Sequence, residues 1–464
     1  MSSKWKNFKL SEFCTKIGSG ATPTGGKSSY SDDGEIALIR SQNVLDFVFS
    51  YDGLAYINSK QAKKLSNVEI EIDDVLINIT GDSVARVCKV PENIIPARVN
   101  QHVSILRVDK SKFSSELLKY LLLVQENKNR LLSLSSSGAT RNALTKTMLE
   151  NFEVFAPEDI DEQQEIADIL KSLDDKIANN NHINQTLEEI AQALFKSWFV
   201  DFEPIKAKIQ AKTEGADPHL AAMMAISGKT EEEIHLFPVK NQKELAKIAD
   251  LFPNDIEETD LGLIPEGWGI KKIGDIYNTS SGGTPSRTNN SFYENGEVLW
   301  VKSKELSNTF IFDTEERITH EAVKKSSAKI IEPFSLLIAM YGATVGQMTI
   351  LSEGATCNQA ICAVSKKAVY DYSYLYLYFQ EYKENLMNMA SGSAQQNISQ
   401  IIIKNFEILV PDKKLASEFQ KKVHHLFIEI LHNSKENVNL SNIRNNLLPK
   451  LLNGEIKLDG GYGI

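Results

Sequence analysis

The sequence predicts an α+β protein with two homologous mixed α/β domains, joined by two long helices that form an antiparallel coiled coil with pseudo-twofold symmetry. Three observations lead to this prediction: an internal repeat, short β-type runs followed by a helical stretch in each copy, and a heptad pattern after each copy. The expected order is a domain over 1–157, a helix over 158–202, a linker with some helix over 203–265, a domain over 266–411, a helix over 412–456 and a tail over 457–464.

The repeat runs through most of the chain. Residues 29–41 are SYSDDGEIALIRS and residues 291–303 are SFYENGEVLWVKS, with glycine, glutamate and serine at matching positions. The further matches, in chain order, are 20–23 with 282–285, 75–82 with 336–343, 100–101 with 358–359, 137–142 with 392–397, and 151–157 with 405–411. Matches in one order with a slowly drifting offset indicate a duplication.

Each copy begins with short β-type runs between Gly, Ser, Asn and Asp turns. These runs are EIALIRS, DVLINIT and VSILRV in the first copy, and EVLWVKS, SLLIAMY and AICAVS in the second. A helical stretch follows in each copy, and a last short strand leads into Pro157 or Pro411. The pattern predicts a mixed domain of about 150 residues that occurs twice.

After each proline the apolar period becomes helical. In the first copy the seam positions are Ile166, Leu170, Leu173, Ile177, Leu187, Ala191, Leu194 and Trp198. Shifted by 253 residues, the seam positions of the second copy are Phe419, Val423, Leu426, Ile430, Leu440, Arg444, Leu447 and Leu451. Steps that alternate between four and three residues form a heptad seam. Two amphipathic helices that pack only on their own domains are the alternative.

Asparagines occupy the centre of both seams. Asn180 and Asn184 lie in the first helix, and Asn433 and Asn437 lie in the second. Antiparallel pairing would place Asn180 near Asn437 and Asn184 near Asn433. Buried amides cost stability but fix register and orientation, because a slipped pairing leaves them without partners.

The linker over 203–265 is polar and rich in turn residues. It carries 7 Lys and Arg against 12 Asp and Glu, and the first helix region over 156–202 carries 3 against 11. The stretches DPHLAAMMAI and KELAKIAD predict some helix within the linker. The net charge of −10 is therefore concentrated in the middle of the chain. Any nucleic-acid contact must rely on local basic and polar clusters of the two domains.

The composition also limits the protein class. There is no apolar run of 18 residues and no apolar signal core in MSSKWKNFKLSEF, so we expect a cytoplasmic protein without a membrane contact. The four cysteines form no CxxC pair and no zinc-type cluster with histidine, which predicts reduced, buried thiols and no metal site.

Catalytic motifs are weak throughout. No Pro-Pro dipeptide occurs, so the Asn/Asp-Pro-Pro-aromatic loop of adenine N6-methyltransferases is missing. ATPTGGKS at 21–28 fits a relaxed phosphate loop, but a predicted strand follows it where a helix N-terminus would be needed. We expect no catalytic residue in the chain. A self-sufficient NTPase or nuclease, and a scaffold that binds proteins only, are the competing hypotheses.

Three segments resemble type I restriction–modification specificity subunits: LFKSWFVDFEP at 194–204, DLGLIPEGW at 260–268 and LLPKLLNGEI at 447–456. The SGxTP segment at the start of each copy is also similar to that family, although Ala21 replaces its second glycine in the first copy. The resemblance implies that each domain reads one half of a split, asymmetric double-stranded DNA sequence. The helix pair would set the gap between the halves.

The resemblance also implies partners. Two methyltransferase subunits would use S-adenosylmethionine to methylate adenine N6, and restriction subunits would use ATP and Mg²⁺. The chain itself would bind no cofactor.

Arg, Lys, Asn and Gln read base edges, whereas Ser, Thr and backbone amides position phosphates, and such residues concentrate in loops. In the first domain the candidate DNA-binding residues are Thr22, Lys27, Arg40, Ser41, Gln42, Asn43, Arg98, Asn100, Gln101, Thr140, Arg141 and Asn142. In the second they are Thr284, Arg287, Lys302, Ser303, Lys304, Asn358, Gln359, Gln395, Gln396 and Asn397. The alternative is that the Gly/Ser/Thr segments are only turns and that Asn100 and Asn358 cap strands.

Residues shared by the two copies, such as Asn100 and Asn358, are expected to be scaffold. Residues that differ, such as Arg141 against Gln396, are better candidates for half-site choice. The copies diverge most over 44–72 and 306–332, so we expect them to read different base sequences.

Overall fold

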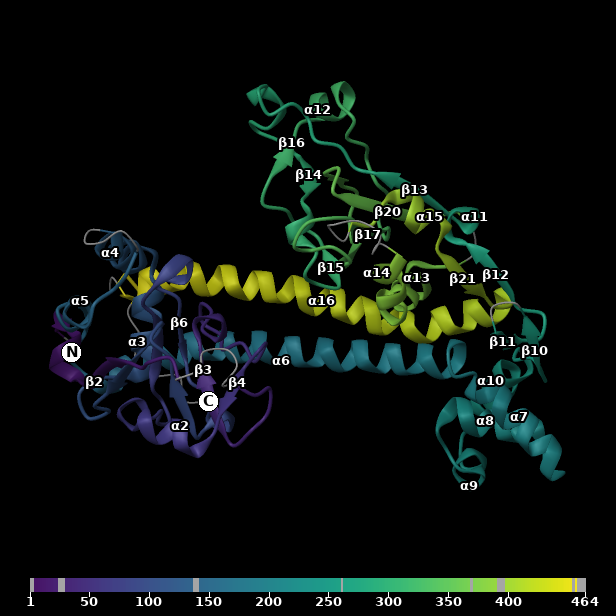
Figure 1. Cartoon of the computed structure of the whole chain (residues 1–464), viewed down its shortest axis with the longest axis horizontal. Helices are drawn as coiled ribbons and strands as arrows, with labels where there is room; N and C mark the ends of the chain where they lie inside the picture. The colour runs from purple at the N-terminus through teal and green to yellow at the C-terminus, as the bar shows by residue number, and fades with distance from the viewer. Residues whose placement is uncertain are drawn as a thin grey trace. The chain divides into compact units, whose positions relative to one another are not determined.

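The computed structural model describes residues 4–23, 30–136, 142–259, 262–367, 370–389, 397–452 and 455–456. The chain divides into unit 1, residues 1–179 and 437–464, and unit 2, residues 180–436. Each unit holds one α/β domain and one segment of each long helix, α6 (Ile160–Phe199) and α16 (Lys413–Leu452). Figure 1 shows these two helices in teal and yellow.

The domain of unit 1 is built on two small sheets and a strand pair. The strands are β1 (Trp5–Lys9), β2 (Cys14–Ser19), β3 (Ile36–Ile39), β4 (Ala55–Ile57), β5 (Val75–Asn78), β6 (Val87–Lys89), β7 (Ala97–Val99), β8 (Val103–Val108) and β9 (Glu153–Pro157). One sheet has the order β2-β8-β5-β6, the other has the order β4-β3-β7, and β1 pairs with β9. The β3–β7 pairing is parallel, whereas the other pairings are antiparallel.

Short helices complete this domain: α1 (Leu10–Phe13), α2 (Ser59–Lys64), α3 (Ser115–Leu123), α4 (Gln125–Ser136) and α5 (Lys146–Glu150). Helix α3 begins at a serine cap, where the Ser114 hydroxyl accepts a hydrogen bond from the amide of Leu117 at 3.3 Å. Nearly every α3 side chain is buried, because α3 lies between the sheet and the first segment of α6. Valine and isoleucine runs supply the sheet core, as the β-type patterns predict.

The domain of unit 2 repeats this plan. Its strands are β12 (Gly269–Lys272), β13 (Tyr277–Ser281), β14 (Val298–Val301), β15 (Phe310–Ile311), β16 (Arg317–Ile318), β17 (Leu336–Ala339), β18 (Met348–Leu351), β19 (Thr356–Cys357), β20 (Ile361–Lys366) and β21 (Glu407–Val410). The order β13-β20-β17-β18-β15 matches β2-β8-β5-β6 with one strand added, β16-β14-β19 matches β4-β3-β7, and β12–β21 matches β1–β9. The duplication is confirmed.

The helices of this domain are α11 (Ile273–Ile276), α12 (His320–Lys325), α13 (Tyr372–Glu381), α14 (Lys383–Met389) and α15 (Gln400–Asn405). Helix α13 corresponds to α3, but it is tyrosine-rich. The hydroxyls of Tyr370, Tyr374 and Tyr378 donate to the carbonyl oxygens of Pro411, Leu409 and Glu407 at 2.8, 2.8 and 3.0 Å. The bonds of Tyr374 and Tyr378 tie α13 to β21, and that of Tyr370, just before the helix, reaches Pro411 at the end of β21.

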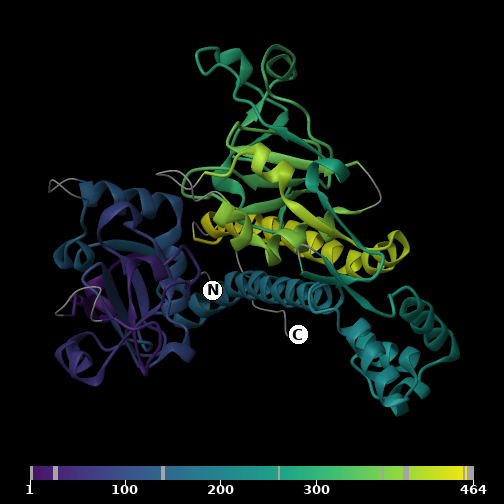
Figure 2. The ribbon, with the colours of Figure 1, turned by 45° about the vertical axis from the view of Figure 1, so that its right-hand side comes forward.

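The linker contains more structure than its composition predicts. Between α6 and the second domain lie α7 (Glu203–Glu214), α8 (Pro218–Ser227), α9 (Glu231–His235) and α10 (Val239–Asp250), followed by the strand pair β10 (Ile256–Thr259) and β11 (Gly262–Pro265). Helices α8, α9 and α10 enclose a small core of Ala222, Met223, Ile234, Leu245 and Ala249. Figure 2 shows these helices as a cluster at the lower right. The sequence predicts α8 and α10 but misses α7 and α9. Helix α9, with five residues, is too short to show a helical period, and α7, with 12 residues, has only two large aliphatic residues, Ile205 and Ile209.

The two long helices are antiparallel in unit 2. The Asn433 amide donates to Asn184 Oδ1 at 3.0 Å, and further along the helices Phe195 packs on Phe419, with ring centroids 6.0 Å apart. Residue numbers therefore rise along α6 as they fall along α16. This is the pairing of Asn184 with Asn433 that antiparallel packing predicts.

Unit 1 has the same direction of pairing. Ile166, Ala167 and Leu170 share a core with Leu448 and Leu451, and Arg444 Nη1 lies 2.6 Å from Asp174 Oδ1. The antiparallel coiled coil is therefore confirmed within each unit. The predicted proximity of Asn180 and Asn437 joins the two units and stays a prediction. Within unit 2, the Asn180 amide donates to Glu436 Oε2 at 2.6 Å.

The helix bounds differ slightly from the expected 158–202 and 412–456. Phe202 adopts a left-handed conformation, with φ of 54°, immediately before α7 begins at Glu203, so the chain turns there. Asp412 immediately precedes α16 and caps it: its carboxylate accepts a hydrogen bond from the amide of Lys414 at 2.8 Å.

Candidate nucleic-acid interface

Residues 40–43 follow β3 and hold the loop that comes next. The Arg40 guanidinium donates to the Gly53 carbonyl, and the Gln42 amide donates to the carbonyls of Asp52 and Gly53, both at 3.2 Å. The buried Asn43 amide donates to the Asp52 carbonyl at 3.2 Å. These side chains were predicted to contact DNA, but in this structure most of their donors are used within the domain. Of the set, Gln42 remains exposed.

Arg98 is also engaged within the domain. Its side chain is almost fully buried, Nη2 lies 3.2 Å from Glu69 Oε1, and Nη1 donates to the Ala97 carbonyl at 2.8 Å. These partners satisfy a guanidinium whose burial without them would be costly. In this conformation Arg98 does not face solvent.

Two contacts recur in both copies. The Thr22 hydroxyl donates to Gln101 Oε1 in the first domain, and the Thr284 hydroxyl donates to Gln359 Oε1 in the second. The side-chain oxygen of Asn100 accepts from the His102 amide at 2.9 Å, and that of Asn358 accepts from the Ala360 amide at 3.1 Å. Because the same contacts occur in two domains whose other loop side chains differ, they do not distinguish one DNA sequence from another. We therefore assign these residues to holding the loops in shape.

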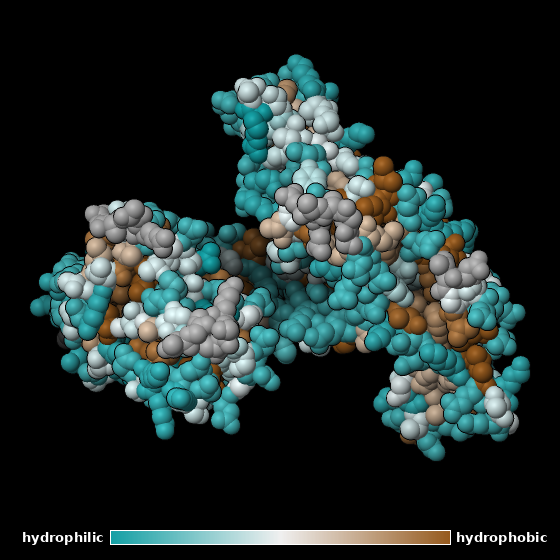
Figure 3. Space-filling view, viewed as in Figure 1, coloured by the Kyte–Doolittle hydropathy of each residue, from teal (hydrophilic) through white to brown (hydrophobic). Residues whose placement is uncertain are grey.

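The cations of the second domain surround two acids. Lys302 Nζ lies 3.0 Å from both Glu315 Oε2 and Glu316 Oε1. Lys304 lies 2.6 Å from Glu315, and Arg287 lies 2.7 Å from Glu316. The structure thus brings Arg287 together with Lys302 and Lys304, three predicted DNA contacts, around the same two glutamates. Figure 3 shows a largely hydrophilic surface over this part of the second domain, near α12 and β16.

The pKa values of this cluster follow from its pairing. Hydrogen bonds from Lys304 and Lys302 lower the pKa of Glu315, and those from Arg287 and Lys302 lower the pKa of Glu316. Burial alone would lower the pKa of Lys302, but the two glutamates outweigh it and raise that pKa. Glu315, Glu316 and Lys302 are therefore charged at neutral pH.

The remaining candidates differ in their accessibility. Asn142 and Asn397 are exposed, and Ser303 is half-buried. Five candidates lie outside the described residues: Lys27, Thr140, Arg141, Gln395 and Gln396. Their roles, like those of the other candidates, stay predictions.

A hollow of about 840 Å³ in unit 1 contains residues that the sequence missed. Its predicted members are Ser41, Gln42 and Asn142. The polar side chains beside them that were not predicted are Thr80, Asp82, Ser83, Arg86 and His102. The sequence alignment of the two copies could have indicated these residues. Residues 75–82 align with 336–343, and the side chains at the end of this match differ between the copies.

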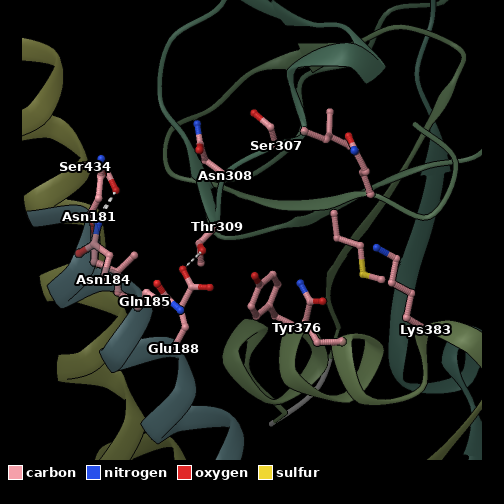
Figure 4. A pocket seen from close by; sticks show the side chains of 15 residues that line it. Asn181, Asn184, Gln185, Glu188, Ser307, Asn308, Thr309, Tyr376, Lys383 and Ser434 are labelled. Atoms are coloured by element: carbon pink, nitrogen blue, oxygen red, sulfur yellow. Dashed lines mark hydrogen bonds between the residues drawn. The ribbon is translucent and has the colours of Figure 1, made fainter. Parts of the chain in front are cut away.

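A second polar pocket, of about 500 Å³, lies in unit 2 between α6, α13 and α16. Figure 4 shows Glu188 of α6 directed at Thr309, whose hydroxyl donates to the carboxylate. Burial raises the pKa of Glu188. Asn184, Tyr376 and Lys383 also line this pocket. The pocket lies where α6 contacts the second domain. We therefore assign its polar groups to holding the domain against the helix.

The described residues contain no cluster of His, Cys, Asp or Glu that could hold a metal ion.

Burial raises the pKa of Cys14, Cys88, Cys357 and Cys362 to about 12 each, so these thiols are protonated at neutral pH. Within the described residues of the chain, no helix combines the length and the apolar character that a membrane span requires.

The comparisons with known proteins agree with this architecture. The family model described as type I restriction modification DNA specificity domain matches residues 2–189 and 265–440. The HindI specificity subunit of Haemophilus influenzae is 32% identical over 473 residues, covering 98% of this chain and 100% of the relative. The MjaIX specificity subunit of Methanocaldococcus jannaschii is 25% identical over 450 residues, covering 96% and 92%.

Among solved structures, the crystal structure of the S subunit of a type I restriction–modification system from M. genitalium covers 97% of this chain and 96% of its own. The TM-score is 0.52 at 13% sequence identity, which is a likeness of fold. The two matched regions coincide with the two α/β domains and most of the helix that follows each one. The chain therefore belongs to the type I restriction–modification specificity subunits.

Proposed function

We propose that each α/β domain reads one half of a bipartite, asymmetric DNA target and that the helix pair sets the gap between the halves. One observation supports this most strongly: the two domains share strand order and loop-framing contacts but present different side chains. A duplicated frame with unlike surfaces suits two readers of different sequences better than one catalytic site.

The proposal assigns the chemistry to partner subunits. Two methyltransferase subunits dock on the helix pair and use S-adenosylmethionine, and restriction subunits supply ATP- and Mg²⁺-dependent cleavage. The chain binds none of these cofactors and carries no catalytic residue. Its own contribution is positioning: the sequence-reading side chains decide which adenine the methyltransferase meets.

The test is a comparison of methylated bases in genomic DNA with and without the gene for this chain. We expect a bipartite adenine-methylated motif that disappears on deletion and returns when the gene is restored. A restored gene that lacks residues 266–411 serves as a control and should not restore the same motif. If deletion removed no bipartite motif, the proposal would be wrong. In that case, loss of nucleotide hydrolysis on deletion would favour the NTPase alternative.

Neutralising both acids of the cation cluster should strengthen non-specific DNA binding. In the double variant Glu315→Gln/Glu316→Gln, Lys302, Lys304 and Arg287 lose their carboxylate partners and become free to contact phosphates. Each added phosphate contact steepens the slope of log affinity against log salt by about 0.9. Fluorescence anisotropy with a non-target duplex, from about 50 to about 200 mM salt, measures the slope.

The matched control is Glu231→Gln/Glu232→Gln on α9. It changes the net charge equally, and both of its residues belong to the linker. An equal effect in this control would show that net charge alone matters. An unchanged slope in the first variant would show that the three cations do not reach DNA.

A further inference from the structure

The hairpin loop between β5 and β6 has the same backbone as the loop between β17 and β18. The amide of Ala85 donates to the Asn78 carbonyl at 2.9 Å, and the amide of its counterpart Gly346 donates to Ala339 at 2.9 Å. The next bonds also match: Asn78 N to Arg86 O, and Ala339 N to Gln347 O, both at 2.9 Å. The chain therefore presents one loop geometry twice.

Left-handed residues at matching positions define this geometry. Gly81 and Gly342 have φ of 78° and 87°, and Ala85 and Gly346 have φ of 65° and 76°. Alanine in this conformation costs roughly 1–2 kcal/mol. The first domain keeps the loop shape despite that cost, which indicates that the shape itself is used.

The side chains on this shared loop differ between the copies. The first domain has Thr80, Asp82 and Arg86 where the second has Tyr341, Ala343 and Gln347. His102, which follows Asn100 and Gln101, stands where the second domain has Ala360. His102 is held in place, because its Nδ1 lies 2.5 Å from the Thr80 hydroxyl and its Nε2 lies 2.9 Å from the Gln101 amide.

The side chain of Arg86 differs from those of Arg40, Arg98 and Lys302 in its lack of partners among the described residues. Arg40 and Arg98 donate to backbone carbonyls of their own domain, and Lys302 is held by two glutamates. Among the described residues, the half-buried guanidinium of Arg86 has no carboxylate partner and makes no hydrogen bond. It lines the 840 Å³ hollow together with the exposed Asp82.

We propose that Arg86 and Asp82 form a base-edge site that reads a G·C pair in the half-site of the first domain. A guanidinium donates two hydrogen bonds to guanine O6 and N7, and a carboxylate accepts one from cytosine N4. Ser41, Gln42 and Asn142 lie in the same hollow and supply neutral contacts beside it. This inference rests on the proposed function, because it names residues that perform it.

The test replaces Arg86 in the full chain, which is expressed with its methyltransferase subunit in cells that lack other adenine methylation. In the variant Arg86→Gln, one guanine position of one half-site should lose its guanine preference by roughly ten- to hundred-fold, with a shift towards adenine. The other half-site should stay unchanged and thereby reports correct folding and assembly. The control Lys64→Gln removes an exposed charge on α2 and should leave both half-sites unchanged.

A second arm changes the DNA and keeps the protein intact. For the wild-type complex, 7-deazaguanine at one guanine of the first half-site should weaken binding about ten-fold, because N7 is removed. The Arg86→Gln complex should be insensitive to the same change. This experiment still tests the inference if Arg86→Gln abolishes methylation, because it uses the wild-type complex. If the wild-type complex bound equally well with 7-deazaguanine at every guanine position, the inference would be wrong.

An unchanged motif in Arg86→Gln would also overturn it. That failure is distinct from failure of the proposed function, in which the wild-type chain would give no bipartite motif at all.

Discussion

Replacing Asp174 with alanine should lower the free energy of unfolding of unit 1 by about 3–5 kcal/mol. Asp174 Oδ1 lies 2.6 Å from Arg444 Nη1, and Asp174 Oδ2 accepts from the Tyr120 hydroxyl at 2.6 Å and from Lys119 Nζ at 3.2 Å. Without the carboxylate, the almost fully buried Arg444 guanidinium loses its ion-pair partner and retains its hydrogen bonds to Asn445 Oδ1. Breaking such a pair costs more than the pair itself contributes, because the remaining charge stays desolvated.

The loss should appear as faster amide hydrogen exchange in α3 and in the last turns of α16, with α13 in unit 2 unchanged. The neighbouring residue provides the control. Asp175 lies on the same helix, is exposed, and pairs with Lys171 four residues earlier. Asp175→Ala should cost less than about 1 kcal/mol. Equal effects of the two changes would mean that the contacts of Asp174 contribute no more than a surface ion pair.

Replacing Phe419 with alanine should destabilise unit 2 by about 3–5 kcal/mol. Its ring is fully buried and contacts four other rings across α6 and α13. The ring centroids of Phe199, Trp198, Phe195 and Tyr374 lie 4.9, 5.7, 6.0 and 6.4 Å from that of Phe419. Removing the shared ring leaves a cavity that these neighbours fill only in part, because three of them belong to one rigid helix.

Urea unfolding monitored by exchange in α13 and in the last turns of α6 measures this effect. Ile428→Ala is the control on the same helix, because Ile428 is 38% exposed. Apart from the difference in helix propensity, Ile428→Ala should change the free energy of unfolding by no more than about 0.5 kcal/mol. A small effect of Phe419→Ala would contradict the view that this aromatic cluster joins the helix pair to the second domain.

Corresponding positions of the two long helices contact their domains through different chemistry. Asp174 of α6 corresponds to Phe427 of α16 at the shift of 253 residues, and Arg444 corresponds to Ala191. Unit 1 joins its domain to the helices through a carboxylate network, and unit 2 does so through Phe427, whose ring lies 6.2 Å from Phe310 and 5.8 Å from Tyr376. The contacts that join each domain to its own segments of the long helices therefore differ in chemistry.

Much of the fold follows from the sequence by itself. The duplication, the strand-rich domains and the two long helices were predicted because each leaves a repeated local pattern: matched segments, β-type runs between turns, and heptads with central asparagines. The pairing of Asn184 with Asn433 follows from the same pattern, since a buried amide requires a partner at a fixed register. These patterns are found by reading the residues in order and by comparing one copy with the other, so none of them requires knowledge of the fold.

The state of the candidate DNA contacts was decided only by the tertiary structure. Glu315 and Glu316 pair with Lys302, and Glu69 pairs with Arg98, through contacts between separate segments of the chain that no local pattern reveals. Arg86 stood outside the predicted site because its importance comes from what surrounds it: a left-handed loop and a hollow formed by segments far apart in sequence. The sequence determines which side chains are present, but whether a charge is paired or free depends on what the fold brings within a few ångströms of it.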